Sequence, residues 1–236
     1  MRVPWLMVVL VPACMAQVKM GHIHLNVSDV DAQLRFWTTQ FDATPLPGGV
    51  GVQVPGMQIL FNHQSPTAGT EGTGLDHFGF KVRNRDEMVA KARASGYTIT
   101  RVFTGSEGFP NAYVLGPDNL RVEMQEASEL TVSAVAQHLH FLVPAYWELR
   151  TWYVDTFGMT VTTRGPHISA DIAGMNLTFA TSKTPNNRPT RGGLIDHIAF
   201  EVGSLATYCG RPQVTCTGNT ARMTDPNGVS IELTAP

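Results

Sequence analysis

The sequence predicts an α+β fold of four βαβββ modules, arranged as two homologous halves. The first observation is an internal repeat, because Gly21-His22-Ile23-His24-Leu25 returns 116 positions later as Gln137-His138-Leu139-His140-Phe141. The second is that each half splits again, since the pattern of a strand followed by a helix and further strands restarts at His77 in the first half and at His197 in the second. The third is a common order of elements in every quarter: a strand, a helix, then two or three strands.

The repeat divides the chain into residues 17–127 and 131–236, which we predict to be two domains. Modules 1 and 2 form the first half, and their leading strands begin at His22 and His77. Modules 3 and 4 form the second half, with leading strands that begin at His138 and His197. We use these four module numbers throughout.

The elements of module 1 follow from alternation and from capping residues. Alternating apolar residues with β-branching predict a strand over 22–27, and Ser28 or Asp29 can cap a helix that runs to about Phe41. Short runs broken by Gly and Pro predict strands near 51–54 and 57–61. The same reading of module 2 predicts a strand over 77–82, a helix over 86–95 that Gly96 ends, and strands near 98–103, 112–115 and 120–124.

The second half repeats this order more weakly. Module 3 has a strand from His138, a helix near 147–157 and strands through Phe179. Module 4 has a strand from His197, a short helical piece over 204–209 and strands that continue to Leu233. The helix of module 4 is therefore predicted to be nearly absent.

Composition excludes several classes of protein. The 236 residues carry 17 Lys and Arg against 19 Asp and Glu, without the basic face that a nucleic-acid-binding protein needs. With 43% hydrophobic residues the chain can bury a core, so it is not a disordered protein. No run reaches the roughly 18 apolar residues of a membrane-spanning helix. We expect the partner to be a small-molecule substrate.

Residues 1–16, MRVPWLMVVLVPACMA, predict a signal peptide that is removed after Ala16. Arg2 supplies the positive start, and an apolar stretch too short to span a bilayer follows it. One alternative is a lipoprotein signal with Cys14 as the acylated residue, although Pro12 fits that pattern badly. Another is a first buried strand, which Pro4 and Pro12 interrupt. The expected location is secreted or periplasmic, or lipid-anchored through Cys14.

Cysteine usage agrees with an oxidising compartment. The chain has three cysteines and no CxxC, so a thiolate zinc site is not expected. Removal of residues 1–16 leaves Cys209 and Cys216, which can then pair. Against this pairing, Cys209 ends a short predicted helix while Cys216 lies in a predicted strand, so their Cα atoms could lie beyond the roughly 7 Å limit.

Histidines concentrate at equivalent points of the four modules. Six of the eight lie at the starts of the leading strands: His22, His24, His77, His138, His140 and His197. A single strand histidine is usually structural, but six at equivalent points indicate at least one metal site. Glu123 and Glu232 end aligned eight-residue segments, Gly116–Glu123 and Asp225–Glu232, and a solvated end strand is their alternative explanation.

Four such modules resemble the vicinal oxygen chelate superfamily, which includes glyoxalase I, bleomycin-resistance proteins and extradiol dioxygenases. The resemblance spans residues 18–236. It rests on Val27-Ser28-Asp29 before Phe36-Trp37, on Leu75-Asp76-His77-Phe78-Gly79-Phe80, on Asp196-His197-Ile198-Ala199-Phe200, and on Asp225-Pro226-Asn227-Gly228 before Glu232. It implies two domains, each a cupped mixed sheet with flanking helices, in which the leading strands of paired modules lie side by side.

The resemblance implies a two-histidine, one-carboxylate metal set in each half. The first set is His22, His77 and Glu123, and the second is His138, His197 and Glu232. Asp225-Pro226-Asn227-Gly228 is the cleaner family turn, so the C-terminal set is expected to be the better metal site. Mixed imidazole and carboxylate ligands without thiolate favour Fe(II) or Mn(II) over Zn(II).

Two further histidines share the strand face of the predicted ligands. His24 and His140 stand two positions after His22 and His138, and residues i and i+2 of a strand face the same side. Each can therefore be a ligand, a residue that orients a ligand, or the acid–base of the pocket. Counting back from the Ser or Pro that ends the strand in the family motif assigns His22 and His138 as ligands, with His24 and His140 lining the pocket.

The resemblance favours a metal-dependent enzyme that acts on a small oxygen-bearing substrate, as a dioxygenase of extradiol type or as a lyase or isomerase. Two features depart from known members. The second carboxylate of glyoxalase I has no match near Leu60 or Thr178, although Gln58, Asn176 or His63 could replace it weakly. The additional acid–base His and Tyr of the extradiol enzymes have no obvious match either. The alternative is a binding protein that sequesters a ligand without catalysis, like the bleomycin-resistance group.

Overall fold

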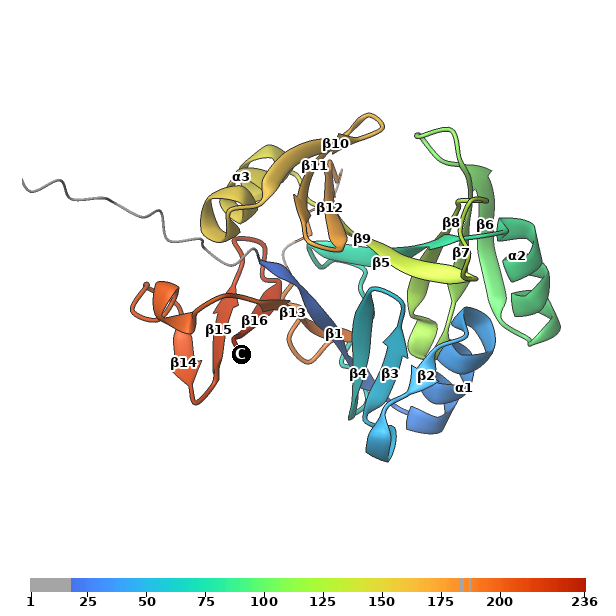
Figure 1. The fold of residues 1–236 in the computed structure, drawn as a ribbon, viewed down its shortest axis with the longest axis horizontal. Helices are drawn as coiled ribbons and strands as arrows, with labels where there is room; N and C mark the ends of the chain where they lie inside the picture. Colours follow the sequence, from blue (N-terminus) through green and yellow to red (C-terminus); the bar gives the residue numbers. More distant parts are fainter. Residues whose placement is uncertain (1–17, 183–184, 187) are drawn as a thin grey trace, which may run out of the picture.

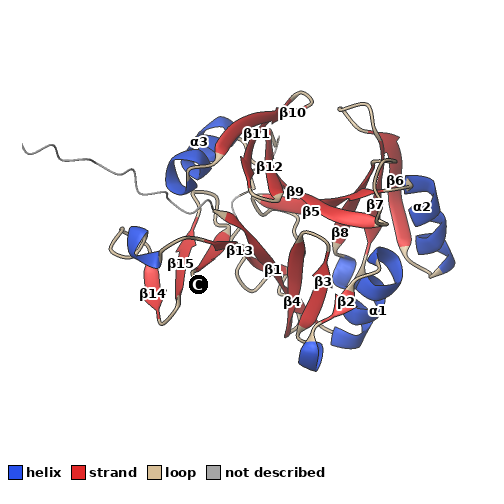
Figure 2. Ribbon diagram, in the orientation of Figure 1, coloured by secondary structure: helices blue, strands red, loops and turns tan. Residues whose placement is uncertain are grey.

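The computed structural model describes residues 18–236, apart from 183, 184 and 187. The described residues form two eight-stranded mixed sheets with three α-helices on their outer faces, which confirms the predicted α+β class (Figures 1 and 2). The predicted signal peptide, residues 1–16, lies outside the described residues. No helix of the described part is long and apolar enough to cross a membrane.

Module 1 follows the predicted order closely. The side chain of Asp29 accepts a hydrogen bond from the backbone N–H of Ala32 and so caps the first helix. The chain leaves that helix at Asp42, which is in the left-handed conformation with φ of 51°. The elements are β1 (Lys19–Val27), α1 (Val30–Phe41), β2 (Thr44–Pro45), a 3₁₀ turn (Pro47–Gly49), β3 (Gly51–Val54) and β4 (Met57–His63).

Module 2 repeats this arrangement. The side chain of Asn84 accepts a hydrogen bond from the backbone N–H of Glu87 and begins the helix, and Gly96, at φ of 82°, lets the chain turn away as predicted. The elements are β5 (Leu75–Val82), α2 (Arg85–Ala94), β6 (Thr98–Thr104), β7 (Pro110–Leu115), a 3₁₀ turn (Pro117–Asn119) and β8 (Arg121–Glu126).

Modules 3 and 4 complete the chain, and module 4 has only a 3₁₀ turn where the others have a helix. The elements of module 3 are β9 (Ala134–Leu142), α3 (Tyr146–Phe157), β10 (Thr160–Arg164), β11 (His167–Ile172) and β12 (Met175–Ala180). Those of module 4 are β13 (Ile195–Glu201), the 3₁₀ turn (Leu205–Thr207), β14 (Thr215–Thr217), β15 (Thr220–Thr224) and β16 (Ser230–Thr234).

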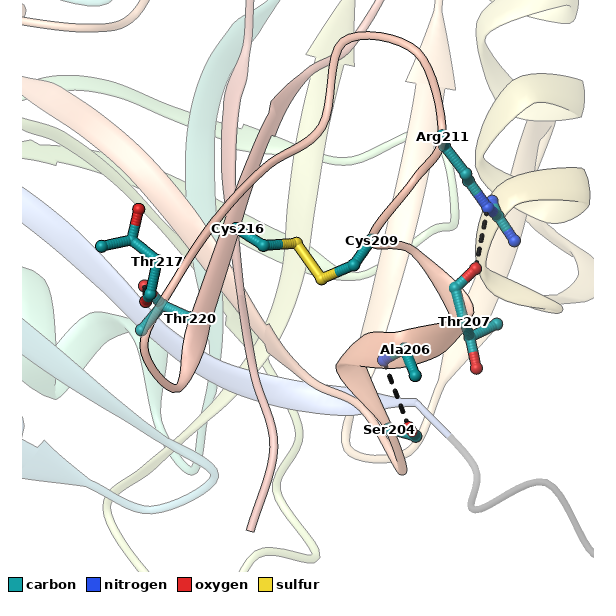
Figure 3. The surroundings of a disulfide bond; sticks show 8 residues. All are labelled: Ser204, Ala206, Thr207, Cys209, Arg211, Cys216, Thr217 and Thr220. Atoms are coloured by element: carbon teal, nitrogen blue, oxygen red, sulfur yellow. Dashed lines mark hydrogen bonds between the residues drawn. A yellow bond between two sulfur atoms is a disulfide. The ribbon is translucent and has the colours of Figure 1, made fainter.

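A disulfide fastens the short helical turn of module 4 to the outermost strand of its sheet. Cys209 and Cys216 are joined with their Cα atoms 6.0 Å apart, inside the range that a disulfide requires (Figure 3). The pairing considered from the sequence is therefore present. The helical segment and the strand come closer than their separate predictions suggested, because the chain turns sharply between them.

The two sheets exchange modules between the halves. The first sheet has the order β14-β15-β16-β13-β1-β4-β3-β2, and we call it the 1–4 sheet after its modules. The second has the order β10-β11-β12-β9-β5-β8-β7-β6, and we call it the 2–3 sheet. In each sheet two leading strands pair antiparallel at the centre, β1 with β13 and β5 with β9.

The expectation that leading strands of one half lie side by side is therefore wrong. All four leading strands carry equivalent apolar alternation, so their pattern allows either pairing. The chain favours β5 with β9 because only residues 127–133 separate β8 from β9, and such a short link keeps modules 2 and 3 neighbours. Modules 1 and 4 then pair with each other.

Within each half the modules meet through a helix rather than through strands. Trp37 and Phe41 of α1 pack on β5 of the other module, with the ring of Phe41 4.7 Å from that of Phe80 and the ring of Trp37 6.0 Å from that of Phe78. In the second half, Phe157 of α3 lies 5.1 Å from Phe200 of β13. Aromatic packing thus joins modules of one half, while the ladders of hydrogen bonds join modules of opposite halves.

We predict that fragments 18–129 and 130–236 cannot each fold alone as monomers. Either fragment exposes the inner edges of two central strands, and unpaired edges of this kind destabilise a sheet and promote association. Mixing equal amounts of the two fragments should give a 1:1 complex in analytical ultracentrifugation. This complex should have the circular dichroism spectrum of the intact protein. A monomeric fragment with cooperative urea unfolding would contradict the exchanged pairing.

Candidate metal centre

The centre of the 2–3 sheet holds a cluster that we call the buried centre: His77 on β5, Glu123 on β8, and His138 and His140 on β9. One donor atom from each residue lies within 4.8 Å of the others. The register explains the convergence, because Gly79 is the pairing partner of both His138 and Glu123, and His77 pairs with His140. Hydrogen-bonded neighbours on adjacent strands face the same side of a sheet, so the four side chains meet.

Gly79 makes room for this cluster. A Cβ atom at position 79 would lie 2.2 Å from Cε1 of the His138 ring, which is closer than any real contact. The imidazole of His138 therefore lies directly over the backbone of β5 and reaches the carboxylate on the far side. No residue with a side chain can replace glycine here without displacing His138.

Two imidazoles converge on one carboxylate oxygen. Nε2 of His77 lies 3.0 Å and Nε2 of His138 2.9 Å from the same oxygen, Oε2 of Glu123. The other oxygen of Glu123 accepts a hydrogen bond of 2.6 Å from the side-chain amide of Asn111. The Glu123 carboxylate is thereby fixed with Oε2 directed at the space between the rings of His77 and His138.

The far nitrogen of each ring is oriented by an outer partner. Nδ1 of His77 lies 2.6 Å from Oδ2 of Asp76, and Arg121 holds that carboxylate by an ion pair. Nδ1 of His138 lies 2.5 Å from Oε1 of Gln137. When the Nδ1 atoms carry the proton and donate to these partners, the Nε2 lone pairs face the centre, which is the tautomer that a metal-binding histidine requires; without an ion the Nε2 atoms can instead donate to Glu123.

His140 is the member that sequence reasoning placed only in the pocket. The residue is half-buried, but both of its ring nitrogens are buried and neither has a hydrogen-bond partner among the described residues. Buried polar atoms normally have a partner, so two orphaned nitrogens beside a carboxylate fit a site that takes an ion or a ligand atom. The donor set of three imidazoles and one carboxylate, without thiolate, also fits a divalent transition metal.

Burial and hydrogen bonding set the protonation states. Burial lowers the pKa of His138 to about 4 and holds the pKa of His140 well below its ordinary value, so both rings are neutral at pH 7. Burial opposes protonation of His77 too, but hydrogen bonds with Asp76 and Glu123 outweigh it and raise the pKa of His77. Burial would raise the pKa of Glu123, yet hydrogen bonds from His138 and His77 hold it far below its usual range, so Glu123 is ionised.

Two hairpin ends meet beside the buried centre. Glu107, between β6 and β7, forms a 2.9 Å ion pair with Nε of Arg164 at the end of β10. Next to it, the Ser106 hydroxyl lies 3.1 Å from Nε2 of His167 on β11, whose ring is 5.7 Å from that of His140. Because these contacts join opposite sides of the 2–3 sheet, they cover the approach to His140.

A second cluster lies on the 1–4 sheet, and we call it the open centre: His22 and His24 on β1 and His197 on β13. It borders a cavity of about 330 Å³, whose lining includes His24, His197 and Arg222. Burial lowers the pKa of His22 to about 4. Glu232, the predicted carboxylate ligand, is instead bound by Arg222 at 2.8 and 3.0 Å.

The structure redistributes the predicted ligand sets. His77 and Glu123 meet His138 rather than His22, and His197 lies beside His22 rather than His138. The set of His138, His197 and Glu232, expected to be the better site, is therefore not assembled. The cause is the exchange of modules described above, which places each half's leading strand against the opposite half.

Comparison with known proteins supports the fold. No protein-family model and no curated protein sequence matches the chain. Among solved structures, glyoxalase I from Zea mays superposes with a TM-score of 0.66 at 16% identity, over 92% of each chain. A proposed dioxygenase from Bacillus subtilis gives 0.65 at 14% identity, over 93% of this chain and 86% of that one. The cppA protein from Streptococcus pneumoniae gives 0.58 at 10% identity, over 94% and 100%.

This chain has the vicinal oxygen chelate fold. The buried centre lies on the sheet that modules 2 and 3 form together. On β12 the strand position paired with His140 is Thr178, which is not a carboxylate, in agreement with the sequence prediction. The fourth side chain of the buried centre is instead His140.

Metal binding at the buried centre should release one proton when the pH lies below the raised pKa of His77. His138 and His140 are already neutral and Glu123 is already ionised, so only His77 carries a proton that an ion must displace. Affinity should rise with pH, by about tenfold per unit below the raised pKa of His77, and level off above it. Titration calorimetry in two buffers of different ionisation enthalpy measures the released proton.

The matched variant for this measurement is Asp76→Asn. It removes the charge that helps to raise the pKa of His77, so the pH at which affinity levels off should fall and the proton release at pH 7 should decrease. Proton release that is equal in both proteins would contradict the assignment of the proton to His77.

Proposed function

We propose that this protein is a metal-dependent enzyme of the glyoxalase and dioxygenase type, acting on a small substrate with vicinal oxygen atoms. One observation carries the proposal: Nε2 atoms of His77 and His138 converge on a single oxygen of the ionised Glu123, with the orphaned nitrogens of His140 beside them. A purely structural cluster would satisfy those nitrogens internally.

We assign His77, His138 and Glu123 as the ligands, and Fe(II) or Mn(II) as the metal. Two imidazoles and one carboxylate form the set that suits these ions and leaves positions for other ligands. A metal bound there supplies a Lewis acid that polarises an oxygen atom of the substrate and lowers the pKa of a hydroxyl group. Asn111 and Asp76 keep the ligands in place through their hydrogen bonds with Glu123 and His77.

His140 is assigned as the proton acceptor. Its ring is neutral at pH 7, and its nitrogens lie within the cluster with no other described residue to bind. A substrate hydroxyl seated at the ligands can therefore give its proton to His140. The neighbouring ring of His167, held by Ser106, limits the space beside His140 and favours a small substrate.

Metal content and turnover test this assignment. After anaerobic reconstitution with Fe(II) or Mn(II), His77→Ala and Glu123→Gln should weaken binding at the buried centre by more than about 100-fold, because loss of an outer partner alone costs about 10–100-fold. His140→Ala should retain the metal and lose turnover. Activity is measured as oxygen uptake and as isomerisation, with a panel of catechols and α-hydroxy carbonyl compounds.

His63→Ala is the control, because His63 is an exposed histidine at the end of β4 outside both clusters. It should keep both metal and turnover. Wild-type protein that takes up no metal at the buried centre would refute the enzyme and favour a binding protein that sequesters its ligand. Equal turnover of wild type and His140→Ala would refute the role of His140 alone.

We also propose that the protein is exported and that residues 1–16 are removed. The signal-like start of the sequence supports this, and so does the Cys209–Cys216 bond, since disulfides persist mainly in oxidising compartments. Mass spectrometry of the protein from its native host should find Gln17 as the first residue. An intact Met1 would contradict export, and an acylated Cys14 would replace cleavage after Ala16 with lipid anchoring.

A further inference from the structure

The open centre differs from the buried centre in its donor atoms. His22, His24 and His197 each bring one ring nitrogen, and these lie within 4.8 Å of one another. The ring centroids of His24 and His197 are 4.7 Å apart, and those of His22 and His197 are 5.6 Å apart. No carboxylate belongs to the group, and two nitrogens of Arg222 hold Oε2 of Glu232.

Two histidines of the open centre, His22 and His197, each keep a buried Nε2 atom that no described residue contacts by a hydrogen bond. Nδ1 of His197 lies 2.8 Å from Oδ2 of Asp196, while its Nε2 is buried without a described partner. Asp196 is itself fixed, because its Oδ1 accepts hydrogen bonds from the backbone N–H of Gly192 and from the side chain of Asn26. Nε2 of His22 is likewise buried and unpartnered within the described part of the chain. An outer carboxylate that fixes one tautomer is typical of a metal-binding histidine.

One arginine, unpaired in the described part of the chain, lines the cavity beside this cluster. The cavity, of about 330 Å³, is lined by Arg191, Arg222 and Asp196, together with the amide side chains of Asn26, Asn62 and Gln64, and Arg222 is already paired with Glu232. The Arg191 guanidinium forms no ion pair or hydrogen bond with a described residue, so its charge is available to a ligand. Imidazole ligands bring no charge that would reduce the charge of a bound ion, whereas the carboxylate of Glu123 brings one at the buried centre.

We propose that the open centre is a second, independent metal site that binds Zn(II) through His22, His24 and His197 and takes a small oxyanion, such as a carboxylate, at its remaining position. Three histidines with one open position form a familiar zinc arrangement. The undiminished charge of the ion and the guanidinium of Arg191 both attract an anion. The proposal does not depend on the function proposed for the buried centre, since the two sites share no residue.

Metal stoichiometry tests the site directly. The metal-free protein should bind two equivalents of Zn(II), or of Co(II) as a coloured probe, measured by titration calorimetry and by elemental analysis after gel filtration. His24→Gln and His197→Ala should each bind one equivalent, and so should His77→Ala, which affects only the buried centre. The double variant His24→Gln/His77→Ala should bind none tightly, and His63→Ala should bind two.

The anion is tested with acetate and inorganic phosphate as probes. Each should change the visible spectrum of the Co(II) ion that His77→Ala retains at the open centre, and Arg191→Ala added to that variant should weaken this response at least about tenfold without loss of the ion. Arg93→Ala, which removes an exposed arginine from α2, is the charge-matched control and should leave the response unchanged. A response to acetate alone identifies a carboxylate site, and a response to phosphate alone identifies a phosphate site; either supports an oxyanion.

Three results would overturn the proposal. One is a single Zn(II) equivalent that His77→Ala abolishes. Another is two equivalents that survive His24→Gln with unchanged affinity. The third is a Co(II) spectrum that neither anion alters. Near-UV circular dichroism of each metal-free variant separates loss of a ligand from loss of the fold. Failure at the open centre leaves the expected effects of His77→Ala and Glu123→Gln on catalysis untouched, so the two hypotheses are distinguished.

Discussion

The antiparallel pairing of leading strands from opposite halves is the constraint on which both centres depend. It places His77 of β5 against His140 of β9, and His24 of β1 against His197 of β13. His77 and His197 stand near the starts of β5 and β13, whereas the histidines paired with them on β9 and β1 stand beyond the middle of their strands, so antiparallel pairing brings them to the same level of each sheet.

The two centres arise from the same repeat and yet differ in charge and access. At the buried centre Glu123 lies between two imidazoles, and Asn111 fixes its second oxygen. At the open centre Arg222, on the neighbouring β15, draws the equivalent Glu232 into an ion pair. One arginine on an adjacent strand thus leaves the open centre with imidazole side chains only, where the buried centre also has a carboxylate. The two sheets thus share one strand pattern but present different side chains at their centres.

Much of the fold could be predicted from the sequence, because its signals are local. Asp29 caps α1 and Gly96 follows the end of α2 as expected, and the strand alternation located every leading strand. The pairing of those strands could not be predicted, because it depends on which of four similar apolar edges meet. Five of the six proposed ligands were predicted as ligands and His24 was predicted to line the pocket, but the grouping of the ligands followed the wrong pairing. Whether the ring nitrogens of His140 have hydrogen-bond partners depends on residues from other strands, so no sequence pattern predicts that they lack them.

The exchange of modules also sets the order in which the molecule can be built. Every strand of the 2–3 sheet lies between residues 75 and 180, so this sheet and its buried centre can form once that segment is available. In contrast, β1 can pair with β13 only after most of the chain has been synthesised. Pairing between strands that are far apart in the sequence is also slow. Until then the inner edge of β1, with Ile23 and Leu25, is unpaired and open to association with other chains. Among the described strands, β1 is therefore synthesised first but pairs among the last. The rate at which module 4 is synthesised sets how long the nascent protein remains prone to aggregate.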